Sequence, residues 1–232
     1  MRHVIFDTET TGFEPREGHR LVEIGAVEMK HGGLTGRTFH VYVNPERDMP
    51  DGAYQVHKLS AEFLSDKPVF ADPSVGQAFV EFVDDAVLIA HNASFDMNFI
   101  QFELEKAGLP KLDNEVVDTL KIAKRRFPGS PASLDALCNR FGIDLTAREK
   151  DGHGALLDSR LLAEVYIELT GGAQAGLAFE GANAAFGGQR IIVPPNPVRA
   201  APRKALLTDA EKKAHETFIA EMENPLWRRV LN

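Results

Sequence analysis

Cysteine is nearly absent from this chain of 232 residues, which contains only Cys138. A single cysteine excludes an intrachain disulfide, and its place between Leu134 and Phe141 in a helical pattern predicts a buried thiol. No apolar run has the length of a membrane span, and the first residues read as a strand rather than a secretory signal. We therefore expect a cytoplasmic protein with no membrane partner.

Positive charge is also scarce, because 26 Lys and Arg face 34 Asp and Glu and leave a formal net charge of −8. The acidic excess lies in the first 170 residues. Nonspecific affinity for nucleic acid comes mainly from cations that neutralise phosphates, which argues against a tight, free-standing DNA-binding protein. A chain with 44% hydrophobic residues can still bury one good core and carry an appended segment.

Two carboxylates end the first strand pattern, in Phe6-Asp7-Thr8-Glu9-Thr10-Thr11-Gly12. Side chains two apart on a strand share a face, so Asp7 and Glu9 are expected to point the same way. Adjacent anions need a compensating cation or a shared proton, and oxygen ligands favour Mg²⁺ or Mn²⁺ over zinc. A solvated strand end is the alternative explanation for this pair on its own.

A third acid, Asp96, stands at the start of a helical pattern that carries Phe95, Phe99 and Phe102. Alone, it is explained by the helix dipole, which favours an acid in the first turn. A fourth acid, Asp158, lies in a helical pattern over 154–170, on or beside its apolar stripe. A carboxylate there is costly to bury unless a metal or a donor satisfies it.

His153 precedes Asp158 by five residues, so both can face one site only if His153 lies in a loop before the helix. The flanking Gly152 and Gly154 allow such a loop. Histidine is a natural general base near neutral pH. A surface histidine in a glycine loop is the alternative.

Together these residues resemble the DnaQ-like 3′→5′ exonucleases of the DEDDh type, whose four acids and histidine correspond to Asp7, Glu9, Asp96, Asp158 and His153. The resemblance spans residues 1–170 through further segments: Glu23-Ile24-Gly25-Ala26-Val27, Phe39-His40-Val41-Tyr42, Val56-His57, His91-Asn92-Ala93-Ser94-Phe95-Asp96 and Ser133-Leu134-Asp135-Ala136-Leu137-Cys138. It implies an α/β, ribonuclease-H-like fold with a mixed central sheet flanked by helices. The local patterns agree, because early strands are followed by strand–helix alternation. They predict strands at 3–9, 21–29, 38–44, 87–91 and 116–118, and helices at 74–83, 95–107, 119–126, 133–141 and 154–170.

The resemblance also implies two-metal hydrolysis of phosphodiesters with Mg²⁺ or Mn²⁺. Asp7 would bridge both ions, Glu9 and Asp158 would hold the ion that binds the attacking water, and Asp96 would act on the second through water. His153 would take the proton from that water. The substrate-binding residues implied at the terminal nucleotide are Asp7, Thr8, Glu9, Thr10, Val56, His57, Phe95 and Asp158.

Stacking on an apolar wall tolerates any base, so selectivity for mispaired ends would come from fraying. One departure is visible, because bacterial members of the family carry an acidic residue where this chain has Gly52.

We expect three parts: an exonuclease domain at 1–170, a flexible tether at 171–207 and a partner-binding segment at 208–232. Within the tether, Gln174, Leu177 and Phe179 resemble a peptide that contacts the sliding clamp; a helix end with incidental apolar residues is the alternative. Thr208 and Glu211 have capping-box spacing and open a helical stretch through about 223.

The last segment carries the only tryptophan of the chain and resembles the polymerase-binding tail of proofreading family members, with Leu226, Trp227 and Arg228 as anchors. A disordered tail is the alternative. The implied partners are DNA 3′ ends, a polymerase subunit, the sliding clamp and a small third core subunit. Two rival functions remain open. One is an autonomous exonuclease acting on RNA or general DNA ends, and the other is an adaptor with an incidental nuclease.

Overall fold

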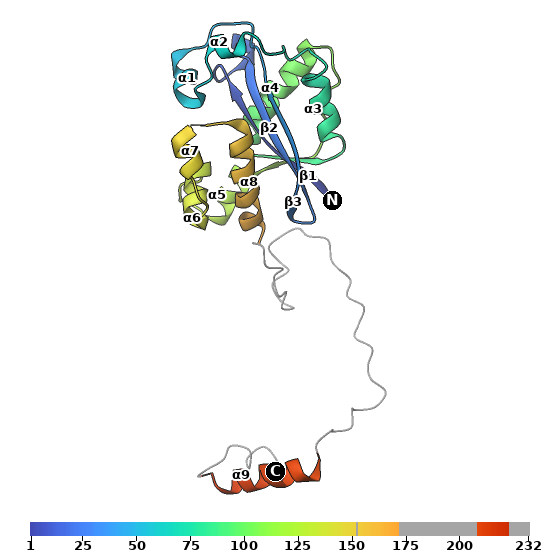
Figure 1. Ribbon diagram of the computed structural model, residues 1–232, viewed down its shortest axis with the longest axis vertical. Coiled ribbons are helices and arrows are strands. Elements are labelled where there is room, and N and C mark those ends of the chain that lie inside the picture. The colour runs from blue at the N-terminus through green and yellow to red at the C-terminus, as the bar shows by residue number, and fades with distance from the viewer. Residues whose placement is uncertain (152, 172–207, 223–232) are drawn as a thin grey trace. The chain divides into compact units, whose positions relative to one another are not determined.

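The computed structural model describes residues 1–151, 153–171 and 208–222 (Figure 1). By its internal contacts the chain divides into two units, Met1–Leu177 and Ala178–Asn232, which are described separately. Along the described residues, no helix has both the length and the apolar character needed to cross a membrane.

The first unit is built on a sheet that, within the described residues, has five strands in the order β3-β2-β1-β4-β5. The strands are β1 (Arg2–Thr10), β2 (Leu21–Lys30), β3 (Gly33–Tyr42), β4 (Val87–Ala90) and β5 (Val116–Asp118). Strand β1 lies at the centre, antiparallel to β2 and parallel to β4. The predicted mixed sheet is therefore confirmed.

Helices cover both faces of this sheet (Figure 1). One core contains α3 and α4, and the other contains α5, α6 and α8. Side chains of β1 point alternately to the two faces of the sheet, so β1 contributes to both cores. Val4 and Phe6 lie in the first core and Ile5 lies in the second. The bounds are η1 (Pro15–Glu17), α1 (Asp51–His57), α2 (Ala61–Leu64), α3 (Gly76–Val83), α4 (Ala93–Lys106), α5 (Thr119–Arg126), α6 (Leu134–Phe141), α7 (Thr146–Asp151) and α8 (Ala155–Thr170).

Two features of this unit differ from the sequence-based expectation. Strand β3 begins at Gly33 rather than at 38, because His31 and Gly32 adopt positive φ angles of 53° and 80° and make a tight turn after β2. Helices α1, α2 and α7 were not predicted, since each is shorter than the window over which helical periodicity can be recognised.

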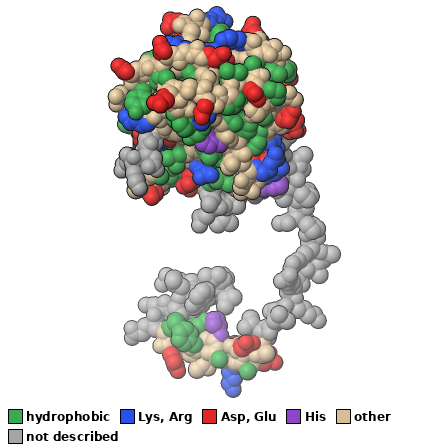
Figure 2. All heavy atoms as spheres, turned by 45° about the horizontal axis from the view of Figure 1, so that its top comes forward, with side chains coloured by type: hydrophobic (Ala, Val, Ile, Leu, Met, Phe, Trp, Pro, Cys, Tyr) green, Lys and Arg blue, Asp and Glu red, His purple; other side chains and the backbone are tan. Residues whose placement is uncertain are grey.

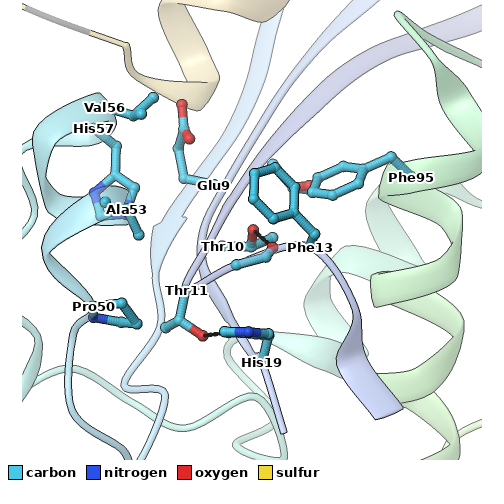
Figure 3. A pocket seen from close by; sticks show the side chains of 13 residues that line it. Glu9, Thr10, Thr11, Phe13, His19, Pro50, Ala53, Val56, His57 and Phe95 are labelled. Atoms are coloured by element: carbon cyan, nitrogen blue, oxygen red, sulfur yellow. Dashed lines mark hydrogen bonds between the residues drawn. The ribbon is translucent and has the colours of Figure 1, made fainter. Parts of the chain in front are cut away.

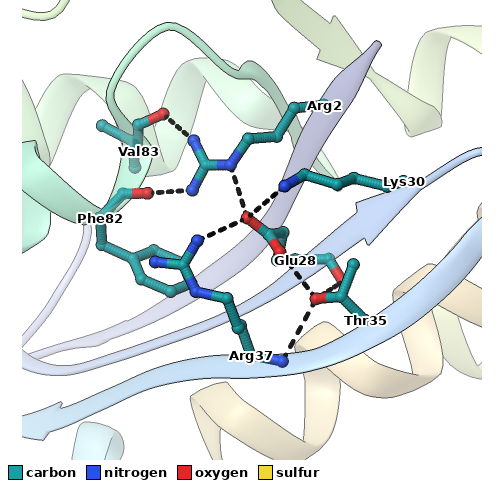
Figure 4. Close-up of polar contacts among 7 residues, drawn as sticks. All are labelled: Arg2, Glu28, Lys30, Thr35, Arg37, Phe82 and Val83. Carbon is teal, nitrogen blue, oxygen red and sulfur yellow. Dashed lines mark hydrogen bonds and ion pairs between the residues drawn. The ribbon is translucent and has the colours of Figure 1, made fainter.

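A buried ion-pair network fastens the end of the sheet that carries the N-terminus (Figure 4). The Glu28 carboxylate accepts from Arg2 Nε at 2.6 Å, from Arg37 Nη1 at 2.9 Å and from Thr35 Oγ1 at 2.8 Å. Arg2 also donates to the carbonyls of Phe82 and Val83 at the end of α3. The network therefore joins β1, β2, β3 and α3.

Glu28→Gln is expected to lower the free energy of unfolding by about 2 kcal/mol near pH 7, because Arg2, Lys30 and Arg37 lose their anion. The Arg2 hydrogen bond, above all, lowers the pKa of Glu28 from 4.5 to about 2. A lowered folded-state pKa stabilises the fold above the unfolded value, and this stabilisation disappears as the pH falls from about 4.5 toward 2. Urea unfolding near pH 7 and near pH 3 should show the gap between variant and unmodified protein closing. Arg37→Gln, at an exposed position, is the control and should cost less than about 1 kcal/mol. An equal gap at both pH values would contradict the electrostatic explanation.

In the second unit the described residues form one helix, α9 (Asp209–Ala220). Its predicted capping box is present, because Thr208 Oγ1 accepts from the Glu211 N–H while the Glu211 carboxylate accepts from the Thr208 N–H at 2.8 Å. The helix ends at Ala220, slightly earlier than expected. Near its end Phe218 and Met222 are exposed.

Candidate active site

The four predicted acids come from three elements that meet beside the end of β1. Asp7 and Glu9 lie on β1, Asp96 in the first turn of α4 and Asp158 in the first turn of α8. Glu9, Asp96 and Asp158 are nearly inaccessible to solvent, and Asp7 keeps some exposed surface although its carboxyl group is surrounded by protein. Because α4 and α8 cover opposite faces of the sheet, the acids approach one another only where β1 ends.

Several contacts fix the position of Asp96. Thr8 Oγ1 donates to Asp96 Oδ1 at 2.8 Å, which joins β1 to α4. The preceding turn is set by Asn92, whose φ of 64° is left-handed, and by Asp118, which accepts from the Asn92 and Leu120 N–H groups at 3.2 and 3.0 Å. Asp118 therefore connects the turn before α4 to the start of α5. The hydroxyl of Thr8, predicted to meet substrate, is engaged with Asp96.

Asp158 is positioned by close packing of α8 on β2. A Cβ on Gly25 would lie 2.1 Å from the Leu156 backbone nitrogen, so only glycine allows this approach. Ser159 Oγ donates to the Gly25 and Ala155 carbonyls, at 2.8 and 2.7 Å. These contacts hold the first turn of α8, which carries Asp158, directly against β2.

The pKa values of three acids in the cluster are raised, which indicates that their charged forms need a nearby cation. Burial, followed by repulsion from Asp96, Glu9 and Asp158, raises the pKa of Asp7 well above its ordinary value. Burial and then Asp158 raise the pKa of Glu9 to about 8. Burial raises the pKa of Asp96 to about 7 against the opposing hydrogen bond from Thr8. Carboxylates in such a cluster are stabilised by a bound metal ion or by a basic side chain.

Glu9, His153 and Asp158 fit a divalent cation by their geometry. Each offers one ligand atom, and these atoms all lie within 4.8 Å of one another. His153 lies between α7 and α8, before the helix begins, as predicted. Its side chain is partly exposed and lines a cavity of about 490 Å³ that also contains Glu23 and His40.

Arg148 in α7 is the residue that sequence reasoning missed. Its guanidinium binds both Asp158 oxygens, with Nε to Oδ1 at 2.7 Å and Nη2 to Oδ2 at 2.8 Å. Nη2 also lies 2.7 Å from His153 Nδ1, and Nη1 donates to Asp135. The only signal in the sequence was an arginine ten positions before Asp158 within a charged run.

A cavity of about 430 Å³ opens beside Glu9 (Figure 3). Val56 and His57 reach it from α1, and Phe95 reaches it from α4. Its other lining residues are Thr8, Thr10, Thr11, Gly12, Phe13, His19, Pro50, Gly52 and Ala53. Phe13, an exposed residue that was not predicted, is among them. The predicted nucleotide-binding residues that are not acids therefore share one cavity.

Within that cavity His57 has an unused polar atom. Its side chain is buried, and Nδ1 accepts from the Leu59 N–H at 3.0 Å. Nε2 is buried and has no hydrogen-bond partner among the described residues. Burial lowers the pKa of His57 against the opposing effects of Glu23 and the Thr10 backbone. Because Nδ1 accepts from Leu59, the neutral ring carries its proton on Nε2. A buried donor of this kind is suited to bind a ligand.

On the face shown in Figure 2, Lys and Arg side chains form separate groups among acidic and hydrophobic ones. The predicted clamp-binding residues Gln174, Leu177 and Phe179 lie outside the described residues, as do Leu226, Trp227 and Arg228. Those two predictions stay predictions.

Comparison with known proteins identifies close relatives. An exonuclease family model, RNase_T, matches residues 4–166. The chain is 53% identical over 178 residues to the DNA polymerase III subunit epsilon of Rickettsia felis, covering 75% of this chain and 76% of that one. It is 41% identical over 245 residues to the subunit epsilon of Escherichia coli K12, covering 98% and 97%.

The fold is also found in solved structures. The nuclease domain of 3′hExo, described as a DEDDh family member bound to rAMP, superimposes with a TM-score of 0.60. The match covers 73% of this chain and 91% of that domain at 19% identity, so it shows a shared fold. The predicted ribonuclease-H-like architecture is therefore confirmed.

Proposed function

Because the chain belongs to the RNase_T exonuclease family and groups there with DNA polymerase III epsilon subunits, we propose that it is the proofreading 3′→5′ exonuclease of that polymerase. The observation that carries the proposal is the convergence of Asp7, Glu9, Asp96 and Asp158 beside His153. It would remove mispaired 3′-terminal nucleotides during DNA replication by hydrolysis of the phosphodiester bond.

In this proposal the four acids hold two divalent cations, Mg²⁺ or Mn²⁺, which supply an activated water and neutralise the leaving oxygen when bound. Asp7 would contribute to both sites, Glu9 and Asp158 to the first, and Asp96 to the second. Thr8 supports this arrangement by orienting Asp96. His153 takes the proton of the attacking water, because it is partly exposed and lies next to Asp158.

The terminal nucleotide would occupy the cavity beside Glu9. Val56 and Phe95 offer apolar walls on which any base can stack, and His57 offers its unpaired Nε2–H to an oxygen of the nucleotide. Mispaired ends fray more easily than matched ends, so selectivity would follow from access to an unpaired terminal nucleotide. Gly52, the position at which the sequence departs from the family it resembles, leaves open space at the rim of this cavity.

Three partners complete the proposal. The DNA polymerase III alpha subunit would bind the C-terminal segment 208–232 through Leu226, Trp227 and Arg228. The beta sliding clamp would bind Gln174, Leu177 and Phe179 in the tether at 171–207, and a small third core subunit would bind the exonuclease domain at 1–170. The acidic character of the chain supports this assembly, because partners would then supply the affinity for DNA.

Digestion of a 3′-mispaired and a matched primer–template with Mg²⁺ tests the proposal directly. We expect the purified full chain to degrade the mispaired end faster, and a truncation after Thr170 to retain this activity, since every proposed catalytic residue precedes that point. The measurement is the initial rate of loss of the terminal nucleotide. An inactive full chain on DNA with activity on single-stranded RNA would overturn the proofreading function. A full chain inactive on both would favour an adaptor role.

A further inference from the structure

The most unusual contact in the site is between the guanidinium of Arg148 and the carboxylate of Asp158. It is bidentate, uses both oxygens of a buried side chain, and extends to His153 Nδ1. Bidentate arginine–carboxylate pairs are among the stronger and more directional hydrogen-bonded ion pairs. A positive group thus already lies where Asp158 and His153 would offer their ligand atoms.

The contact also determines which atom of His153 is available. Arginine nitrogens only donate, so His153 Nδ1 accepts from Nη2 and its lone pair is engaged. Arg148 therefore occupies the Asp158 oxygens that a divalent cation would bind and the His153 nitrogen that a proton would bind. Asp135, which accepts from Nη1, holds the guanidinium from the solvent side.

We propose that Arg148 competes with the divalent cation for Asp158 while it holds His153 Nδ1, and so sets the ion concentration at which the site fills. This inference rests on the metal site of the proposed function. The guanidinium and the metal ion cannot bind Asp158 together, because both need the same carboxylate oxygens and their positive charges repel each other. Release of Asp158 by Arg148 also frees the nitrogen of His153. Arg148 is a positioning residue, acting through Asp158 and His153.

Titration of the full-length protein with Mn²⁺ by calorimetry tests the competition without measuring nuclease activity. Arg148→Gln is expected to bind Mn²⁺ about tenfold more tightly than the unmodified protein, since the internal competitor is gone. Arg148→Lys, which keeps the charge but loses the bidentate geometry, should fall between them. Arg160→Gln is the matched control, because it removes an exposed positive charge near the same cavity without a contact to Asp158.

Melting temperatures give an independent readout. In a chelator, Arg148→Gln should melt below the unmodified protein, because Asp158 then has no counter-ion. With saturating Mn²⁺ the difference should vanish. If Arg148→Gln does not fold in the chelator, Asp135→Asn decides the question, since loosening the guanidinium should also tighten Mn²⁺ binding.

Two results would overturn the inference. If Arg148→Gln, or Asp135→Asn in its place, binds Mn²⁺ as weakly as the unmodified protein or more weakly, Arg148 does not compete with the ion. If Arg160→Gln gains as much affinity as Arg148→Gln, the effect is one of net charge rather than contact. Failure of the unmodified protein to bind Mn²⁺ at all would instead overturn the metal site of the proposed function.

Discussion

Asp7→Asn is expected to reduce the rate of 3′-terminal hydrolysis at least about 1,000-fold, because it removes the carboxylate proposed to serve both metal ions. The substitution keeps the shape of the side chain and removes only its charge. Asp7 lies on β1, the central strand of the sheet. The measurement is single-turnover digestion of a mispaired primer end with Mg²⁺.

The same variant should remain folded, which separates chemistry from stability. Burial and the neighbouring acids already raise the pKa of Asp7, so a neutral side chain relieves repulsion. We expect its melting temperature in a chelator to equal or exceed that of the unmodified protein. Asp85→Asn, at an exposed carboxylate in the turn before β4, is the control and should leave the rate unchanged. Retention of normal activity by Asp7→Asn would exclude the proposed metal site.

Gly25→Ala should damage both stability and activity. Its Cβ would lie 2.1 Å from the Leu156 nitrogen and 2.5 Å from the Ala155 oxygen, and neither backbone atom can yield without moving α8. Overpacking against backbone costs about 3 kcal/mol or more of unfolding free energy. Since Asp158 lies in the first turn of α8, the same shift would move its carboxylate away from Glu9.

Urea unfolding and Mn²⁺ titration together would measure these effects, with lower stability and weaker binding expected. Gly33→Ala is the matched control, since Gly33 is also a strand glycine but has open space around its Cβ position. A Gly25→Ala protein as stable as the Gly33→Ala protein would show that α8 adjusts freely and does not position the acid.

Much of the fold follows from local patterns. Strand β1 was predicted from Val4-Ile5-Phe6, and the long helices α4 and α8 were predicted within two residues of their ends, because each shows several turns of apolar periodicity. Short elements lack this signal. Helix α1, which carries Val56 and His57 to the cavity, is one such element, and only the Val-His motif indicated that these residues mattered.

The site was predictable to a similar degree. The acids and His153 were found from their spacing and family resemblance, and the structure brings Glu9, His153 and Asp158 within ligand distance. Arg148 could not be found, because its importance depends on how the short helix α7 packs beside α8. The bond from Thr8 to Asp96 was also hidden, since it joins residues 88 positions apart.

The central place of β1 has a consequence for synthesis of the protein. Asp7 and Glu9 leave the ribosome first, whereas Asp158 arrives about 150 residues later on the helix that must pack against β1 and β2. Contacts between such distant parts of a chain form late in folding. A copy that ends before Asp158 therefore lacks at least one of the four acids and cannot form the complete site.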